Sequence, residues 1–126
     1  MTTILLVEDD PLEARLILPL LEREFGEVRR ATDAADALGA IEHPDFAGRL
    51  QLVISGQSMN GIKKPEFIAE LHDRMPALQV LVLGMAGESP DDYLGENVTF
   101  LPRPLVPRQV VTAASQLLER EKHRVA

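Results

Sequence analysis

The stretch ILLVEDDP, residues 4–11, gives the clearest indication of the fold of this chain. Its first four residues are apolar without alternation, which is typical of a strand buried on both faces of a parallel sheet. Three acidic residues and a proline then end the strand abruptly. Asp10 is a favourable N-cap and Pro11 a favourable first helical residue, so a helix is expected to follow at once.

The same alternation of a short apolar run and a helical period continues to the end of the chain. Further strands are expected at 28–31, 52–54, 80–83 and 98–101, and helices at 11–25, 34–42, from 65 to before 76, briefly from 89, and at 107–124. Pro19 is expected to kink the first helix, and residues 45–49 are expected to form a loop. Alternating strands and helices predict an α/β fold in which a five-stranded parallel sheet carries helices on both faces. No linker or repeat divides residues 1–126, so one domain is expected.

Composition excludes several classes of protein. The 126 residues include no cysteine, which rules out disulfides, thiolate metal sites and cysteine nucleophiles. No apolar run approaches the roughly 20 residues of a membrane span, and the N-terminus lacks the basic start of a signal peptide. A net charge of -7 argues against direct nucleic-acid binding. A cytoplasmic protein that contacts neither membrane nor nucleic acid is expected.

In open parallel sheets, functional residues lie beyond the carboxyl ends of the strands, where the strand order reverses. Four segments at these positions resemble bacterial response-regulator receiver domains of the CheY-like superfamily: residues 4–11, 52–56 (LVISG), 59–61 (MNG) and 100–104 (FLPRP). The resemblance covers the whole chain in order. It implies a (βα)5 flavodoxin-like receiver fold with strand order 2-1-3-4-5, and a signal-transduction role in a two-component system or phosphorelay.

In receiver domains an acidic pair after the first strand holds Mg²⁺, and an aspartate ending the third strand accepts a phosphoryl group from a histidine kinase. The resemblance places Glu8 and Asp9 on the metal-binding pair and the backbone carbonyl of Ser58 at a further metal position. Gly56 falls on the phosphoacceptor and has no side chain to phosphorylate. A pseudo-receiver is therefore expected, with no catalytic residue, no enzymatic activity, no required cofactor, and weak Mg²⁺ binding at most.

The positions that sense the phosphoryl group in the family have changed as well. Gly84 falls on a Thr or Ser, Arg103 on a Lys, and Phe100 on the aromatic switch position. Arg keeps the charge of Lys but not its shape. The segment between 84 and 100 is shorter than usual for the family, so its helix is expected to be abbreviated. Three departures together favour a natural loss of phosphoryl chemistry over a substitution at 56 alone.

The leading hypothesis is a module that acts by phosphorylation-independent protein–protein interaction. Its partner would be a sensor kinase, a response regulator or an effector domain, or a second copy bound through the last helices and fifth strand. Candidates on that surface are Tyr93, Leu94, Phe100, Val106 and the last helix. Two alternatives stay open: an active receiver using another acceptor carboxylate, such as Asp9 or Asp10, and a small-ligand sensor using space opened by Gly56 and Gly84.

Several side chains have simpler structural explanations. Arg103 is expected to pair with Glu8 or Asp9 across the vacated pocket. Ser55 is expected to face away from position 56 and to be structural. The doublet at 63–64 is expected to be solvated surface, as charged doublets are in most proteins.

Overall fold

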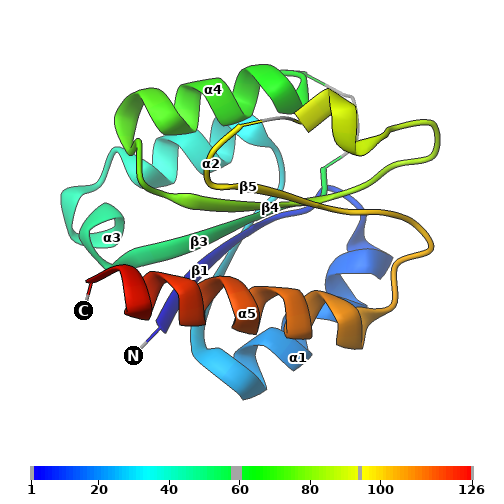
Figure 1. Ribbon diagram of the computed structural model, residues 1–126, viewed down its shortest axis with the longest axis horizontal. Coiled ribbons are helices and arrows are strands. Elements are labelled where there is room, and N and C mark those ends of the chain that lie inside the picture. The colour runs from blue at the N-terminus through cyan, green and yellow to red at the C-terminus, as the bar shows by residue number, and fades with distance from the viewer. Residues whose placement is uncertain (1, 58–60, 94, 126) are drawn as a thin grey trace.

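The computed structural model describes residues 2–57, 61–93 and 95–125, and these form one five-stranded sheet (Figure 1). All neighbouring strands pair in parallel, in the order β2-β1-β3-β4-β5 that the receiver resemblance implied. The strand order reverses between β1 and β3, which places those two strands side by side at the centre. The strands are β1 (Thr2–Val7), β2 (Gly26–Ala31), β3 (Leu50–Ser55), β4 (Gln79–Leu83) and β5 (Val98–Leu101).

Helices cover both faces of the sheet, as predicted (Figure 1). One face carries α1 (Pro11–Phe25) and α5 (Pro107–Val125), and the other carries α2 (Ala34–Ile41), α3 (Pro44–Arg49) and α4 (Lys64–Arg74). Between β4 and β5 the described residues form only one 3₁₀ turn, η1 (Pro90–Tyr93), which confirms the expected abbreviation. No helix in the described ranges is long and apolar enough to cross a membrane.

The helix boundaries follow the capping signals of the sequence. The Asp10 side chain accepts a hydrogen bond from the Leu12 amide at 2.9 Å, and α1 continues through Pro19 to Gly26, whose φ of 99° suits glycine. Asp33 caps α2 in the same way through the Asp36 amide at 2.8 Å. Both caps satisfy amides that the first helical turn leaves unpaired.

Residues 45–49 were expected to form a loop, but they belong to α3, so that prediction is wrong. Pro44 occupies the first turn, where a missing N–H costs nothing. Phe46 is buried in the core that α2 and α4 share. A six-residue helix carries too little periodicity to be seen in the sequence, and the burial of one aromatic ring accounts for its position.

The two faces of the sheet form separate cores because adjacent strand residues point to opposite sides. Leu5 and Val7 of β1 pack with α2, α3 and α4, whereas Ile4 and Leu6 pack with α1 and α5. All four side chains are fully buried. Burial on both faces explains why the sequence of β1 is an uninterrupted apolar run. Polar functional groups can therefore lie only at the ends of such a strand.

Candidate functional site

The carboxyl ends of β1 and β3 bring two of the sequence-predicted site positions together. Val7 pairs with Ser55 in the sheet, and the Gly56 amide donates to the Val7 carbonyl at 2.8 Å. Glu8 and Gly56 are therefore neighbours at the carboxyl ends of two adjacent strands, as the pairing of β1 with β3 requires.

The space beside Gly56 is filled. A Cβ atom placed on Gly56 would lie 2.7 Å from Glu8 Oε1 and 3.1 Å from Leu83 Cδ1. Glu8 Oε1 thus lies in the volume that a side chain at position 56 would need. The expectation of a vacated pocket at position 56 is wrong, because a neighbouring side chain and the core close it.

Glu8 is only 3% exposed, and its Oε2 accepts a hydrogen bond from the Asp10 amide at 3.1 Å. Burial raises the pKa of the Glu8 carboxyl to about 7, with the negative charges of nearby acidic residues adding to the rise and the Asp10 amide opposing it. The Glu8 carbonyl accepts two bonds from Arg30, at 3.1 and 3.0 Å. At neutral pH the carboxyl group is consequently a mixture of its acid and its anion.

The described residues do not fit the Mg²⁺ site that the family implies. Position 56 offers no carboxylate, and Glu8 Oε1 lies in the space beside Gly56. No three acidic or histidine side chains of the described ranges gather in a way that could hold a metal ion. The predicted carbonyl position, Ser58, lies outside the described residues. Hard cations need several oxygen ligands, so we derive no chemistry through a bound metal.

Gly84, the second glycine of the expected pocket, is closed by an aromatic ring. A Cβ atom there would lie 2.7 Å from Phe100 Cζ and 3.2 Å from the Leu101 carbonyl oxygen. Phe100 stacks on Tyr93 with ring centroids 5.6 Å apart and an interplanar angle of 17°. Phe100 packs against the core of α2 and α4, whereas Leu83 beside Gly56 belongs to the core of α1 and α5. The two filled positions therefore lie against different layers of the fold and do not form one shared cavity.

A polar cluster of the buried residues Lys64 and Tyr93 and the half-buried Glu88, here called the Lys64 cluster, ties α4 to the segment after β4. Lys64 Nζ donates to the Leu83 carbonyl at 2.9 Å and to Glu88 Oε1 at 3.1 Å. The Met85 amide also donates to Glu88 Oε1, at 2.7 Å, and the Tyr93 hydroxyl donates to Glu88 Oε2. The cluster fixes the path of the chain from β4 to η1.

Lys64 is fully buried, so the prediction that residues 63–64 are solvated surface is wrong for it, although Lys63 is exposed. Lysine is almost never buried without a partner. The partner lies 24 residues away, and the sequence contains no local signal for this pairing.

The Glu88 and Tyr93 side chains shift each other's proton affinity. Burial alone would raise the pKa of Glu88, but the donors Tyr93, the Met85 amide and Lys64 together lower it below its usual value. Burial, together with donation to Glu88, raises the pKa of Tyr93. The pair is a phenol that keeps its proton and a carboxylate that keeps its charge.

Arg103 lies on the surface. Its Nη2 contacts Met85 Sδ at 3.5 Å, and no ion pair joins it to Glu8 in the described ranges. The structure therefore does not show the expected pairing of Arg103 with Glu8. Ser55, by contrast, is structural as predicted: it is buried and its Oγ donates to Gln57 Oε1 at 2.7 Å.

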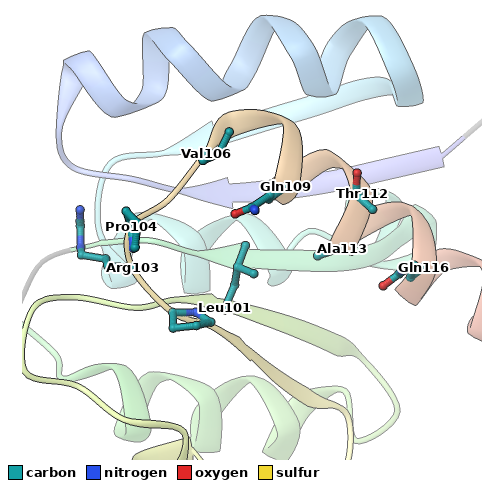
Figure 2. A pocket seen from close by; sticks show the side chains of 9 residues that line it. Leu101, Arg103, Pro104, Val106, Gln109, Thr112, Ala113 and Gln116 are labelled. Atoms are coloured by element: carbon teal, nitrogen blue, oxygen red, sulfur yellow. The ribbon is translucent and has the colours of Figure 1, made fainter.

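The predicted partner surface contains a groove of about 580 Å³ between the end of β5 and α5. Figure 2 shows its lining, to which Leu101, Val106, Gln109 and Gln116 contribute. Val106 is 46% exposed, whereas the predicted surface residue Tyr93 is buried, which corrects that expectation. Leu94 lies outside the described residues.

Known structures share this fold. A response regulator receiver domain protein from Clostridium thermocellum is 21% identical, with a TM-score of 0.84 over 97% of this chain and 98% of that one. The receiver domain of the hybrid histidine kinase CckA is 28% identical, with a TM-score of 0.74 over 92% and 98%. The Vibrio cholerae chemotaxis protein CheY4 is 19% identical, with a TM-score of 0.77 over 93% and 98%. The chain has the fold of response-regulator receiver domains. No protein-family model and no curated protein matches it.

Proposed function

We propose that this chain is a cytoplasmic signalling module of a two-component system or phosphorelay that acts by binding a protein partner without being phosphorylated. The observation that carries the proposal is the closed acceptor site: Gly56 has no carboxylate, and Glu8 fills the adjoining volume. Phosphoryl transfer to a carboxylate needs a nucleophile whose developing charge is offset by metal and cation. None of these elements is assembled around position 56 in the described residues.

The switch elements support the same proposal. Phe100 is held against Gly84 by its stack on Tyr93, and Tyr93 is held in turn by Glu88. A two-state switch requires a ligand that favours one of its two states. Here the contacts favour one state without any phosphoryl group, so the surface formed by β5 and α5 is presented constitutively.

The test is treatment of the chain with acetyl phosphate, and separately with beryllofluoride, each with Mg²⁺. We expect no phosphoryl adduct by intact-mass measurement and no Mg²⁺-dependent change in oligomeric state by sedimentation. A stoichiometric adduct that Asp9→Asn or Asp10→Asn removes would overturn the proposal in favour of an active receiver with another acceptor. A Gly56→Asp variant is the matched comparison, since it restores a carboxylate at the acceptor position.

The groove between β5 and α5 allows a test of self-association. Val106→Asp places a charge on its exposed apolar edge. If a second copy is the partner, sedimentation across a concentration range shows association of the parent chain that this variant loses. If the parent chain stays monomeric, the partner is a different protein.

A further inference from the structure

The two edge strands of the sheet differ in how well they are protected from pairing with another chain. The order β2-β1-β3-β4-β5 leaves one side of β2 and one side of β5 without a neighbouring strand. Free strand edges can pair with other chains, and charged side chains on the edge are a common protection against this. β2 has Glu27, Arg29 and Arg30 among its six residues, whereas β5, with the sequence VTFL, has no charged residue. β5 is therefore the edge that is open to a further strand.

The outer side of β5 presents backbone groups that no described residue pairs. On the inner side, the Val80 amide of β4 donates to the Asn97 carbonyl at 2.9 Å. Successive residues of a strand direct their amides and carbonyls to opposite sides, so the backbone groups of Val98 and Phe100 face away from β4. Within the described ranges, no hydrogen bond reaches these outward groups. A donor and an acceptor at each of two alternate residues form the pattern with which an added strand pairs.

β5 is held in a fixed position for such pairing. The Asn97 side chain accepts from Gln79 Nε2 at 2.9 Å and donates to the Pro76 carbonyl at 3.3 Å, which fixes the start of the strand. The stack of Phe100 on Tyr93 holds the second half of the strand. In Figure 1 β5 runs between α5 and η1, and the groove described above lies beside its end. Because the edge is already ordered, a further strand can pair with it at a small entropic cost.

The charges at the two ends of β5 make the strand complementary to an inverted copy of itself. Glu96 lies just before the strand and Arg103 just after it, both exposed, and neither belongs to an ion pair within the described ranges. In an antiparallel pair the start of one strand lies beside the end of the other. A pair centred on Thr99 aligns Val98 of each copy with Phe100 of the other. The same pair brings Glu96 of each copy near Arg103 of the other, so one two-fold contact satisfies both charges.

We propose that β5 pairs in antiparallel orientation with β5 of a second copy, so that the two sheets join into one continuous sheet across a two-fold axis at Thr99. The inference rests on the proposed function, which assigns binding to the surface of β5 and α5. It names a second copy as the partner and backbone pairing as the mode of binding. Val106 lines the groove beside Arg103, so the charge introduced by Val106→Asp would repel the approaching Glu96 of the other copy.

Charge reversal at the two ends of β5 tests the register. We expect sedimentation of the full chain to show a monomer–dimer equilibrium with a Kd on the order of 100 μM, as suits a small interface. Glu96→Arg and Arg103→Glu each bring like charges together and should weaken the dimer about tenfold. An equimolar mixture of these two variants, or the chain with both reversals, regains the attractive pairs and should associate as the parent does. Glu22→Arg on α1 changes the net charge as Glu96→Arg does, and this matched control should not weaken the dimer.

Hydrogen exchange followed by NMR tests the mode of binding. The amides of Val98 and Phe100 should gain protection as the concentration of the chain rises, whereas the Thr99 amide, which faces β4, should be protected throughout. A parent chain that stays monomeric up to about 1 mM would overturn the proposal and leave the edge to a strand of a different protein.

A dimer that both charge reversals leave unchanged would also overturn the proposal, as would a dimer without protection of the Val98 and Phe100 amides. In either case another surface holds the two copies together. A phosphoryl adduct, which would contradict the proposed function, is measured by mass on the same chain, so the two failures are told apart.

Discussion

The pKa values of two glutamates with little exposure, Glu8 and Glu88, are shifted in opposite directions. Glu8 has one backbone donor on its carboxyl group, and burial raises its pKa to about 7. The Glu88 carboxylate accepts hydrogen bonds from Lys64, Tyr93 and the Met85 amide, and together these donors lower its pKa despite its burial. Burial is the largest single cause acting on both carboxyl groups, and only at Glu88 do the supplied donors together outweigh it.

The contrast also separates a position predicted from the receiver resemblance from a cluster that only the structure reveals. Glu8 stands where the family implies a metal ligand, yet it now fills space beside Gly56. Glu88 falls on no motif of the family quoted above, yet it is the better-satisfied group. If this comparison is right, loss of Lys64 should lower the free energy of unfolding the most. Removal of the Glu8 charge should raise the free energy of unfolding at high pH.

Lys64→Met gives the largest expected effect. It leaves Glu88 without its cation and the Leu83 carbonyl without its donor, and breaking a buried pair costs about 3 kcal/mol of unfolding free energy. Urea denaturation measures the change. The exposed neighbour provides the control, since Lys63→Met should change stability by less than about 0.5 kcal/mol. Equal effects of the two substitutions would show that the buried ion pair stabilises nothing.

Gly84→Ala should cost about 2 kcal/mol, because its Cβ would meet Phe100 Cζ at 2.7 Å and the Leu101 carbonyl at 3.2 Å. Adding Phe100→Leu should recover part of that loss by freeing space. Gly39→Ala is the control within a helix, where nothing lies within 4 Å, and it should stabilise the chain by about 0.5–1 kcal/mol. Thermal melts of the three variants decide whether the site at Gly84 is closed; an unchanged melting temperature for Gly84→Ala would mean that it is open.

Glu8→Gln tests the electrostatic side of the comparison. The pKa of Glu8 is about 7 in the folded chain against 4.5 normally, so between these values the folded state holds a proton that the unfolded state has released. Its contribution to the free energy of unfolding therefore falls as pH rises from about 5 to about 8. The Glu8→Gln variant keeps an acceptor for the Asp10 amide but has no carboxyl group to ionise, so this fall of stability with pH should be absent. At about pH 8 the variant should be about 1–2 kcal/mol more stable than the parent.

Parallel urea titrations across this pH range measure the difference between the two chains. Glu22→Gln, at an exposed position of α1, controls for the loss of one negative charge. If the free energies of unfolding of the parent and of Glu8→Gln change with pH in parallel, then Glu8 ionises normally.

Tyr93→Phe gives the smallest expected effect. It removes the donor to Glu88 Oε2 but keeps the ring that stacks on Phe100. Stability should fall by about 1 kcal/mol, the net contribution of one hydrogen bond. The pKa of Glu88, followed by carboxyl ¹³C NMR, should rise because a donor that lowers it is gone. A Glu88 titration identical to the parent's would show that the hydroxyl plays no part in the Lys64 cluster.

The order of strands and helices could be predicted because it rests on local chemistry. Asp10 and Asp33 cap their helices, Gly26 ends one, and uninterrupted apolar runs mark strands covered on both faces. The short helix α3 was missed, because its position depends on the burial of Phe46 against side chains distant in sequence.

The sequence by itself determined the absence of a carboxylate at position 56, the receiver-like order of elements and the shortened segment before β5. Only the tertiary structure decided which groups lie beside the two glycines. Glu8 fills the volume beside Gly56, and Phe100 fills the volume beside Gly84. Lys64 pairs with Glu88, and the Gln57 Nε2 donor is buried without a partner. The physical reason is that a missing side chain is visible in one residue, whereas the filling of space and the pairing of buried charges are set by contacts between distant segments.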